Sequence, residues 1–218
     1  MPYLIPGVFL YSDDDLPYEA EECYFLDYQI LSALVSIEYL LKPHYDSNMP
    51  FKSKYVYYHF YTDHLLFSWG QICSRFIINN SDNKGERERK QSCSHNFQFD
   101  EIKYPILSDK KARNTIEHLD EYNHYLIQKY DGVGGFNLID SSESEELIDY
   151  LRKNRQTHPY TLDLLKDQLY IQRKEGELTI DLIALKIELE QLQRSVWDYK
   201  SIVDEKAENP NWPIKTES

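Results

Sequence analysis

The sequence predicts a mainly α-helical bundle with a small antiparallel β-hairpin inserted before its last helix. Long segments with apolar residues at helical spacing lie at 18–42, 51–79, 110–130 and 182–203. Two short alternating segments, 167–172 and 177–182, flank a turn that contains Gly176, which is typical of a hairpin. With 218 residues, 41% of them hydrophobic, the chain is long enough to bury a core of its own. We predict one domain over 1–204 and a polar tail over 205–218.

The charge and cysteine content restrict the classes of protein to consider. A formal net charge of −13 opposes non-specific attraction to nucleic acid or to an anionic membrane. Residues 84–113 form a modest exception, with eight basic and five acidic side chains and a local net charge of +3. Three widely spaced cysteines do not form a disulfide framework and fit a reducing cytosol. The first residues lack the basic region of a signal peptide, and the acidic residues within 18–42 argue against a membrane span. We therefore expect a cytoplasmic protein with no membrane partner.

The first half of the chain is predicted to supply two long helices. Residues 3–11 are apolar and broken by Pro6-Gly7, so we expect an extended arm packed on the body. Acidic residues precede the helix at 18–42, whose apolar residues lie on more than one face and predict a central position. The segment 51–79 is long enough to favour a helix, although its aromatic stretch at 55–61 leaves a strand open.

The segment between the second helix and the helix at 110–130 has little periodicity. Residues 80–96 are polar and charged, which predicts a mobile loop. Residues 97–107 are expected to form a connector that leads into the helix.

After residue 130 the pattern becomes mixed. Residues 131–135 are rich in glycine and predict a hinge, followed by a short strand within 134–139. A short helix is expected at 143–154, and the hairpin insert as a whole covers about 133–182. A final amphipathic helix over 182–203 follows, and the tail beyond it is expected to fray.

The helix at 110–130 is the most informative element of the sequence. Ser108 or Asp109 can cap its start, and Asp131-Gly132 ends it. At about 100° per residue, one face forms a core stripe. This stripe consists of Ala112, Ile116, Leu119, Asn123, Leu126, Ile127 and Tyr130. The opposite face is polar and consists of Asn114, Glu117, His118, Glu121 and Tyr125, with Arg113, Asp120 and His124 along the border. Such a face contacts solvent, a partner or a ligand.

The string Arg113-Asn114-Thr115-Ile116-Glu117-His118 resembles the signature of the HEPN superfamily of small helical bundles. That signature is an arginine, a polar residue and then a histidine after four to six intervening residues, at the start of a bundle helix. The longer string RNTIEHLDE is also similar to one that recurs in uncharacterised bacterial HEPN-like proteins. The resemblance covers roughly residues 16–130. Two further arginine-to-histidine spacings, Arg89 to His95 and Arg152 to His158, lack the asparagine and a strong helical context.

The resemblance implies a metal-independent endoribonuclease of toxin or defence type, in which two copies face each other in a homodimer. His118 would transfer protons at the ribose 2′-OH or the 5′-oxygen, since an imidazole titrates near neutral pH. Arg113 would hold the phosphate and stabilise its developing charge. Asn114 would orient one of these groups, and Glu117, Glu121 and His124 would support the site. An antitoxin-like protein is a further expected partner.

Other interpretations remain open at this point. Many HEPN-like proteins have no known catalysis and serve as interaction or regulatory bundles, so the polar helix face is also typical of a partner contact. On an ideal helix Arg113 and His118 differ in direction by about 140°, so a single copy does not bring them together. Glu117 can instead pair with Arg113 in a surface network. A third possibility is a module that binds a nucleotide or another small ligand in a tyrosine-lined pocket of the first two helices.

No motif in the sequence predicts a metal or a cofactor. His59 with Asp63, and Cys93 with His95, lack further ligands at a recognisable spacing. The run Gly132–Gly135 lacks the strand and the Gly-Lys-Ser/Thr of a phosphate-binding loop. The aromatic stretch 55–61 can stack nucleic-acid bases, but packing between helices is the commoner use of such residues.

Overall fold

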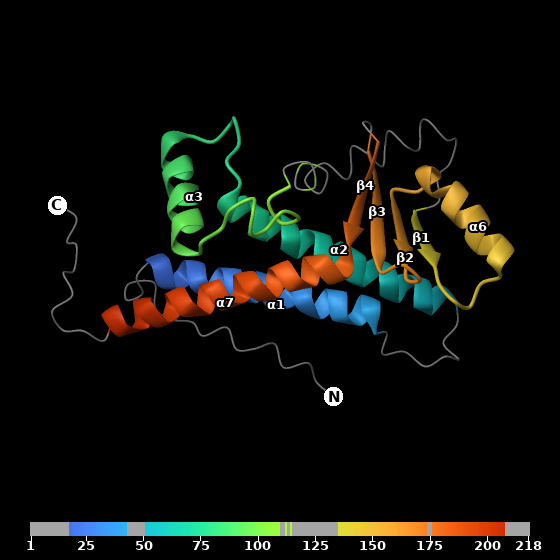
Figure 1. The fold of residues 1–218 in the computed structure, drawn as a ribbon, viewed down its shortest axis with the longest axis horizontal. Helices are drawn as coiled ribbons and strands as arrows, with labels where there is room; N and C mark the ends of the chain where they lie inside the picture. The colour runs from blue at the N-terminus through green and yellow to red at the C-terminus, as the bar shows by residue number, and fades with distance from the viewer. Residues whose placement is uncertain are drawn as a thin grey trace.

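The computed structural model describes residues 18–42, 51–109, 112, 114, 135–173 and 176–207. The described chain is mainly helical, with a small four-stranded sheet. Three long helices lie side by side in an elongated body, with the sheet towards one end and a shorter helix towards the other (Figure 1). The long helices are α1 (Tyr18–Leu41), α2 (Phe51–Phe76) and α7 (Leu182–Ala207). The remaining elements are α3 (Lys84–Asn96), β1 (Phe136–Ile139), α6 (Glu145–Lys153), η1 (Arg155–Thr157), β2 (Tyr160–Asp163), β3 (Gln168–Arg173) and β4 (Gly176–Asp181).

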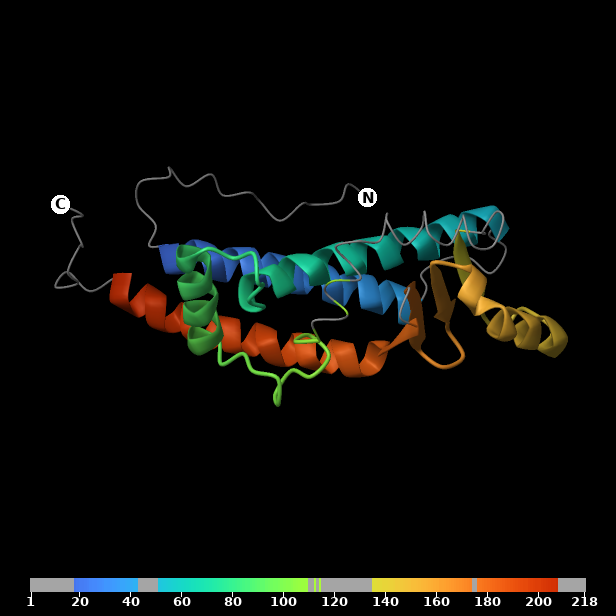
Figure 2. The ribbon, with the colours of Figure 1, turned by 90° about the horizontal axis from the view of Figure 1, so that it is seen from above.

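Helix α1 is the central helix, as its apolar pattern predicts, because it packs against both α2 and α7. Its partners run antiparallel to it. Ser32 of α1 lies beside Ser68 of α2, and Tyr39 lies beside Tyr61. Asp27 of α1 accepts hydrogen bonds from the side chains of Gln193 and Trp197 of α7. Seen from above, the three helices run along the length of the molecule (Figure 2).

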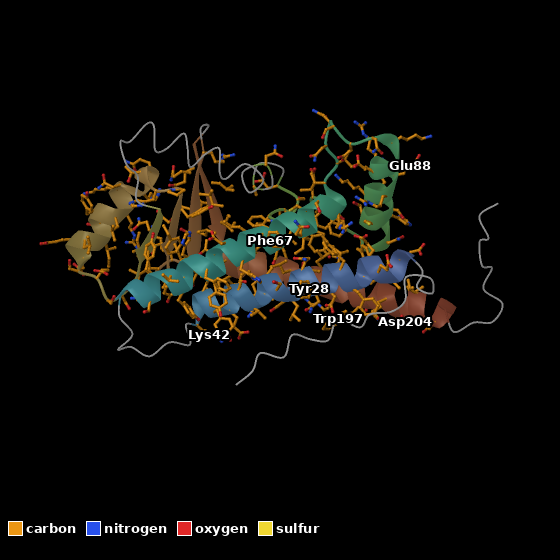
Figure 3. All side chains as sticks on the ribbon, turned by 180° about the vertical axis from the view of Figure 1, so that it is seen from behind. Tyr28, Lys42, Phe67, Glu88, Trp197 and Asp204 are labelled. Carbon is orange, nitrogen blue, oxygen red and sulfur yellow. The ribbon has the colours of Figure 1, made fainter. Side chains whose placement is uncertain are left out.

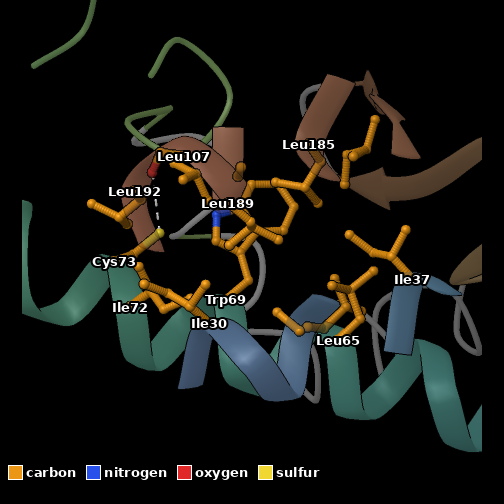
Figure 4. Close-up of a cluster of buried hydrophobic side chains, with 14 of the residues drawn as sticks. Ile30, Ile37, Leu65, Trp69, Ile72, Cys73, Leu107, Leu185, Leu189 and Leu192 are labelled. Carbon is orange, nitrogen blue, oxygen red and sulfur yellow. Dashed lines mark hydrogen bonds between the residues drawn. The ribbon is translucent and has the colours of Figure 1, made fainter. Parts of the chain in front are cut away.

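The core lies between these helices and is filled mainly by branched aliphatic side chains around one tryptophan (Figure 4). Trp69 of α2 is completely buried, next to Ile30 of α1 and Leu189 of α7. The thiol of Cys73 donates a hydrogen bond to the carbonyl of Leu107, 3.2 Å away, which fixes the connector after α3 to the core. Full burial of such large side chains contributes about 2–3 kcal/mol each, so this cluster accounts for much of the stability of the bundle.

The connector is also held by a carboxylate from α7. Glu188 accepts hydrogen bonds from the backbone N–H groups of Ile106 and Leu107 at 2.9–3.0 Å. Burial raises the pKa of Glu188 above its ordinary value, although these hydrogen bonds act in the opposite direction. These hydrogen bonds hold Ile106 and Leu107 against α7, a few residues before Ala112 and Asn114.

The predicted mobile loop over 80–96 is wrong, because Lys84–Asn96 form helix α3. Its start is a capping box: the Asn83 side chain accepts from the Glu86 N–H, and the Glu86 side chain accepts from the Asn83 N–H. Only Lys90 and Cys93 of this helix are buried. The absence of an apolar stripe explains why the sequence pattern favours a loop, whereas the capping residues and the Lys90–Asp82 ion pair at 2.8 Å stabilise a helix.

The sheet has the order β1-β2-β3-β4 and is mixed rather than purely antiparallel. The predicted hairpin is confirmed as β3 and β4, paired antiparallel from Gln168 opposite Asp181 to Arg173 opposite Gly176. Gly176 has φ +122°, a conformation that favours glycine. The predicted antiparallel insert over about 133–182 is wrong at its first strand, because β1 pairs parallel to β2. The reason is helix α6, which provides the crossover that two parallel neighbours require.

The sheet is joined to the start of α2 by hydrogen bonds. The hydroxyl of Tyr55 both donates to the carbonyl and accepts from the N–H of Phe136, each at 2.6 Å. Beside it, Lys54 forms an ion pair with Asp140, and Ser142 also donates to this carboxylate. Burial by itself would raise the pKa of Asp140, but the hydrogen bonds from Lys54 and Ser142 outweigh it and lower the pKa below its ordinary value.

The remaining predictions of secondary structure have clear outcomes. Helices are confirmed at Tyr18–Leu41, Phe51–Phe76 and Glu145–Lys153, which excludes the strand alternative at 55–61. The last helix continues to Ala207 and so extends into the predicted tail. The predicted arm at 3–11, the hinge at 131–134 and the tail at 208–218 lie outside the described residues.

Candidate functional site

Only two residues of the predicted helix at 110–130 are described, and both fit its predicted faces. Ala112 is helical and 1% exposed, as expected for the core stripe. Asn114 is helical and exposed, as expected for the polar face. Arg113, Glu117, His118, Glu121 and His124 lie outside the described residues. The structure therefore fixes the inward side at one position of this helix and leaves the proposed arginine–histidine pair as a prediction.

The two other arginine-to-histidine spacings are in well-described regions. Arg152 of α6 donates to both carboxylate oxygens of the fully buried Asp163, at 2.8 and 3.2 Å. This arginine therefore anchors α6 to the end of β2. In the other spacing, Arg89 to His95, the histidine is exposed near the end of α3. Arg89 lies nearly two turns before it and lines a cavity. Neither of these two spacings brings an accessible arginine and a histidine together in one site.

The described part of the predicted basic patch stabilises the local fold. Arg87 donates to the carbonyls of Asp82 and Asn80, at 3.0 and 3.1 Å. Lys90 is 5% exposed and paired with Asp82, and the ammonium group of Lys103 donates to Ser195 of α7. Arg87, Lys90 and Lys103 thus contribute to the local fold, whereas Lys84 is exposed on the surface of α3.

The residues considered as metal ligands do not assemble into a site. His59 and Asp63 lie one turn apart on the surface of α2, with Nε2 and Oδ2 3.4 Å apart. Cys93 is buried whereas His95 is exposed, so the two side chains do not share a site. Burial raises the pKa of the Cys93 thiol to about 12, which keeps it protonated. Within 18–42, 51–109, 135–173 and 176–207, no three histidine, cysteine or acidic side chains form a cluster suited to a metal ion.

The aromatic stretch 55–61 packs within the protein. Tyr58 is fully buried, and the rings of Tyr61 and Tyr39 stack with centroids 4.5 Å apart. Tyr55 contacts the ring of Phe136 edge-on at 5.4 Å. Packing is thus the main role of this stretch, and the tyrosine-lined ligand pocket of the third interpretation stays a prediction.

A cavity of about 530 Å³ lies between the start of α1, helix α3 and the end of α7. Three carboxylates line it, from Glu19 and Glu22 of α1 and Glu88 of α3. The guanidinium of Arg89 and the aromatic rings of Phe97 and Tyr199 also line the cavity. Its volume lies within the range typical of small-molecule sites. No local pattern in the sequence predicts this cavity, because its walls come from segments that are far apart in the chain.

The outward side of α1 and its two neighbours forms a second unusual surface, which we call the outer face. It consists of the exposed residues Tyr24, Tyr28, Leu31 and Val35 of α1, Phe60 and Phe67 of α2, and Trp197 of α7. Tyr28, Phe67 and Trp197 lie on the same side of the molecule (Figure 3). Tyr28 and Phe67 are 57% and 61% exposed, so large apolar groups face solvent on adjacent helices. Clustered exposed apolar side chains are typical of a surface that binds another molecule.

A hydroxyl–imidazole cluster lies in the seam of α1 and α2 beside the outer face. Ser36 donates to the carbonyl of Ser32, and Ser68 donates to the hydroxyl of Ser32. The hydroxyls of Ser32 and Ser36 both lie within hydrogen-bonding distance of Nδ1 of His64, at 3.2 and 3.1 Å. The ring of Phe60 stacks on His64 with centroids 5.8 Å apart. This arrangement places an exposed imidazole among apolar side chains.

Comparison with known proteins adds no relative. No family model matches the chain, and the searches of curated proteins and of solved structures likewise give no match. None of the helices in the described segments combines the length and the apolar character needed to cross a membrane.

Proposed function

We propose that this protein is a HEPN-like up-down helical bundle that cleaves RNA as a homodimer, without a metal, through Arg113 and His118. The observation that carries the proposal is the string Arg113-Asn114-Thr115-Ile116-Glu117-His118 in a segment whose apolar spacing predicts an amphipathic helix. Burial of Ala112 and exposure of Asn114 support the predicted orientation of its polar face. The packing of α1 with α2 and α7 supports a bundle that can hold such a helix.

The chemistry needs only these side chains because RNA supplies its own nucleophile. His118 accepts the proton of the ribose 2′-OH, and the 2′-oxygen forms a bond to the adjacent phosphorus. The bond from phosphorus to the 5′-oxygen then breaks, and the leaving oxygen takes a proton from an imidazolium. Arg113 binds the phosphate oxygens, where negative charge increases in the transition state. The products are a 2′,3′-cyclic phosphate and a free 5′-hydroxyl.

The test is cleavage of total RNA and of synthetic oligonucleotides in the presence of EDTA. We expect the wild type to produce ends with a 2′,3′-cyclic phosphate, and both His118→Ala and Arg113→Ala to lose about 100-fold or more in rate. His95→Ala is the matched control, because His95 ends another arginine-to-histidine spacing in α3 and is exposed. Equal rates for the wild type and His118→Ala, or loss of activity with EDTA, would contradict the proposal.

A second candidate function is favoured by the outer face. Large apolar side chains exposed on three adjacent helices support a non-catalytic interaction protein that binds through this surface. Here the polar face of the helix at 110–130 would make a dimer or partner contact and would carry no chemistry. Arg113→Ala distinguishes the two functions. A nuclease loses RNA cleavage in this variant but keeps its oligomeric state, whereas an interaction protein has no RNA cleavage to lose.

A further inference from the structure

The part of the outer face that α1 contributes is a continuous stripe of apolar side chains. Tyr24, Tyr28, Leu31 and Val35 follow one another every three or four residues, so they point in the same direction, and they are between 40% and 57% exposed. The opposite side of α1 faces the core, where Ile30 is completely buried. A helix with one covered side is normally polar on its other side. The second apolar side of α1 therefore indicates that something beyond the described residues covers it.

Two aromatic side chains from the neighbouring helices border this stripe. The indole N–H of Trp197 in α7 donates to Asp27 of α1 at 2.9 Å, and the side chain is still 51% exposed. Phe67 of α2 lies on the same side of the molecule as Tyr28 and Trp197 (Figure 3). Because the indole N–H is already bonded, these three side chains offer mainly apolar contacts. The outer face thus suits an occupant that is itself apolar and that contacts three helices at once.

The segment 3–11, which lies outside the described residues, has the composition that such a surface binds. It contains no charged residue. Its apolar and aromatic members are Tyr3, Leu4, Ile5, Val8, Phe9, Leu10 and Tyr11. The segment 208–218 at the other end of the chain, in contrast, has three charged residues and only Trp212 and Ile214 as large apolar ones. Burial therefore stabilises segment 3–11 far more than segment 208–218.

Segment 3–11 is also tethered at the correct place. Residues 12–17 join it to Tyr18, the first residue of α1, and six residues span at most about 20 Å. Tyr24 lies about 9 Å along the helix from Tyr18, and the stripe continues for about 17 Å more to Val35. Nine extended residues span about 30 Å, so segment 3–11 is long enough to follow the whole stripe. A short tether gives a high effective concentration, which favours this segment over a second copy of the chain.

We propose that segment 3–11 binds the outer face of its own chain and runs antiparallel to α1, with its apolar side chains against Tyr28, Phe67 and Trp197. Ser12 and the three aspartates after it are residues typical of the turn that this path requires. A partner that uses the outer face, as in the second candidate function, must first displace this segment. The proposal does not depend on Arg113 and His118, so its failure would leave the proposed nuclease unaffected.

The first experiment places the photoreactive residue p-benzoylphenylalanine at Phe9 of the full chain and identifies the cross-links by mass spectrometry. We expect the product to migrate as a monomer on a denaturing gel, with cross-links in the peptides that contain Tyr28 and Phe67. The same photoreactive residue at Ile102, which is 95% exposed in a turn outside the outer face, is the control and should not reach these peptides.

Three results of this experiment would overturn the proposal. A covalent dimer as the main product would assign the outer face to a second copy. Cross-links on another surface would place segment 3–11 elsewhere. Cross-links confined to the residues next to Tyr18 would reflect the tether alone.

The second experiment measures how open the outer face is, with the uncharged dye Nile red, which fluoresces on apolar surfaces. Leu4→Glu/Phe9→Glu should release the segment and raise dye fluorescence several-fold, because charged side chains are costly to bury. Adding Tyr28→Glu/Phe67→Glu to this variant should remove the gain, since the dye then loses the apolar surface. Circular dichroism and thermal melts check that each variant folds.

Trp212→Glu/Ile214→Glu is the matched control, because it places the same two charges on apolar residues of segment 208–218. Its dye fluorescence should equal that of the wild type. An equal rise in this control would show a general effect of added charge, and equal fluorescence of the wild type and Leu4→Glu/Phe9→Glu would show that the outer face is open while segment 3–11 is intact. Either result would overturn the proposal.

Discussion

Individual side chains connect the sheet of this protein to its helices. The buried carboxylate of Asp163, which binds Arg152 of α6, is the clearest case. Its side chain is fully buried at the end of β2 and receives three hydrogen bonds. Two come from Arg152 of α6 and one comes from the backbone of Leu165. The bonds to Asp163 also raise the pKa of Arg152 above its ordinary value. Such a group is stable only while its cation is present, because a buried charge without a partner is costly.

We expect Arg152→Met to lower the free energy of unfolding by about 2–3 kcal/mol, somewhat less than the ~3–5 kcal/mol typical of breaking a fully buried pair, since Arg152 is partly exposed. Urea denaturation measures this change. Lys186→Met is the control: its exposed ion pair with Glu190, at 3.8 Å, should contribute less than about 1 kcal/mol. The double variant Arg152→Met/Asp163→Asn should regain part of the loss because no unpaired charge remains. Equal stability of Arg152→Met and Lys186→Met would contradict this account.

At the scale of elements, the contact between α2 and the sheet depends on charge. Lys54 of α2 and Asp140, which follows β1, form an ion pair in which both side chains are largely buried. Because the folded pKa of Asp140 lies below its ordinary value, the pair stabilises the fold above the unfolded pKa, near about 4. That contribution is lost as the pH falls through the folded pKa and the carboxylate becomes protonated.

We therefore expect Lys54→Met to be less stable than the wild type by about 2 kcal/mol at pH 7, and the difference to shrink as the pH falls below about 4. Denaturation in urea at a series of pH values measures both effects. Lys84→Met, which removes an exposed pair with Glu88, should show a small difference that hardly changes with pH. A difference for Lys54→Met that stays constant down to the lowest pH would show that the pair contributes by packing and not by charge.

Which elements could be predicted from the sequence depends on how strong their local pattern is. Long helices and the hairpin have strong periodic patterns, and α1, α2, α7, β3 and β4 were found where those patterns lie. Helix α3 was missed although Asn83 and Glu86 have the spacing of a capping box, because its few buried side chains include a lysine. The parallel pairing of β1 with β2 has no signal in either strand, since alternation indicates a strand and not its direction. The cavity depends on Glu22, Glu88 and Tyr199 meeting in space, which no local pattern encodes.

At the scale of the whole molecule, the outer face decides the second candidate function. If this surface joins two copies of the chain, we expect the wild type to be a homodimer and Tyr28→Glu/Phe67→Glu to be a folded monomer, because a charge on each of two adjacent helices opposes burial of this surface. A homodimer formed at the helix over 110–130 would instead persist in this variant. Light scattering after size-exclusion chromatography gives the mass, and circular dichroism checks the fold. Ile102→Glu is the control, since Ile102 is 95% exposed in a turn and is not part of the outer face. A monomeric wild type at all concentrations would contradict the expectation.

The position of α7 beside α1 has a consequence for the order in which the protein forms during synthesis. Asp27 and Trp197, which are hydrogen-bonded at 2.9 Å, are separated by 170 positions in the chain. Helix α3 with its capping box and the β3–β4 hairpin use neighbouring residues, so they can form while translation continues. The inner side of α1, in contrast, stays without its second partner until the ribosome has made Leu185, Leu189 and Leu192. Until α7 has been made, the nascent chain therefore presents the apolar inner side of α1, and burial of that surface follows the folding of the more local elements.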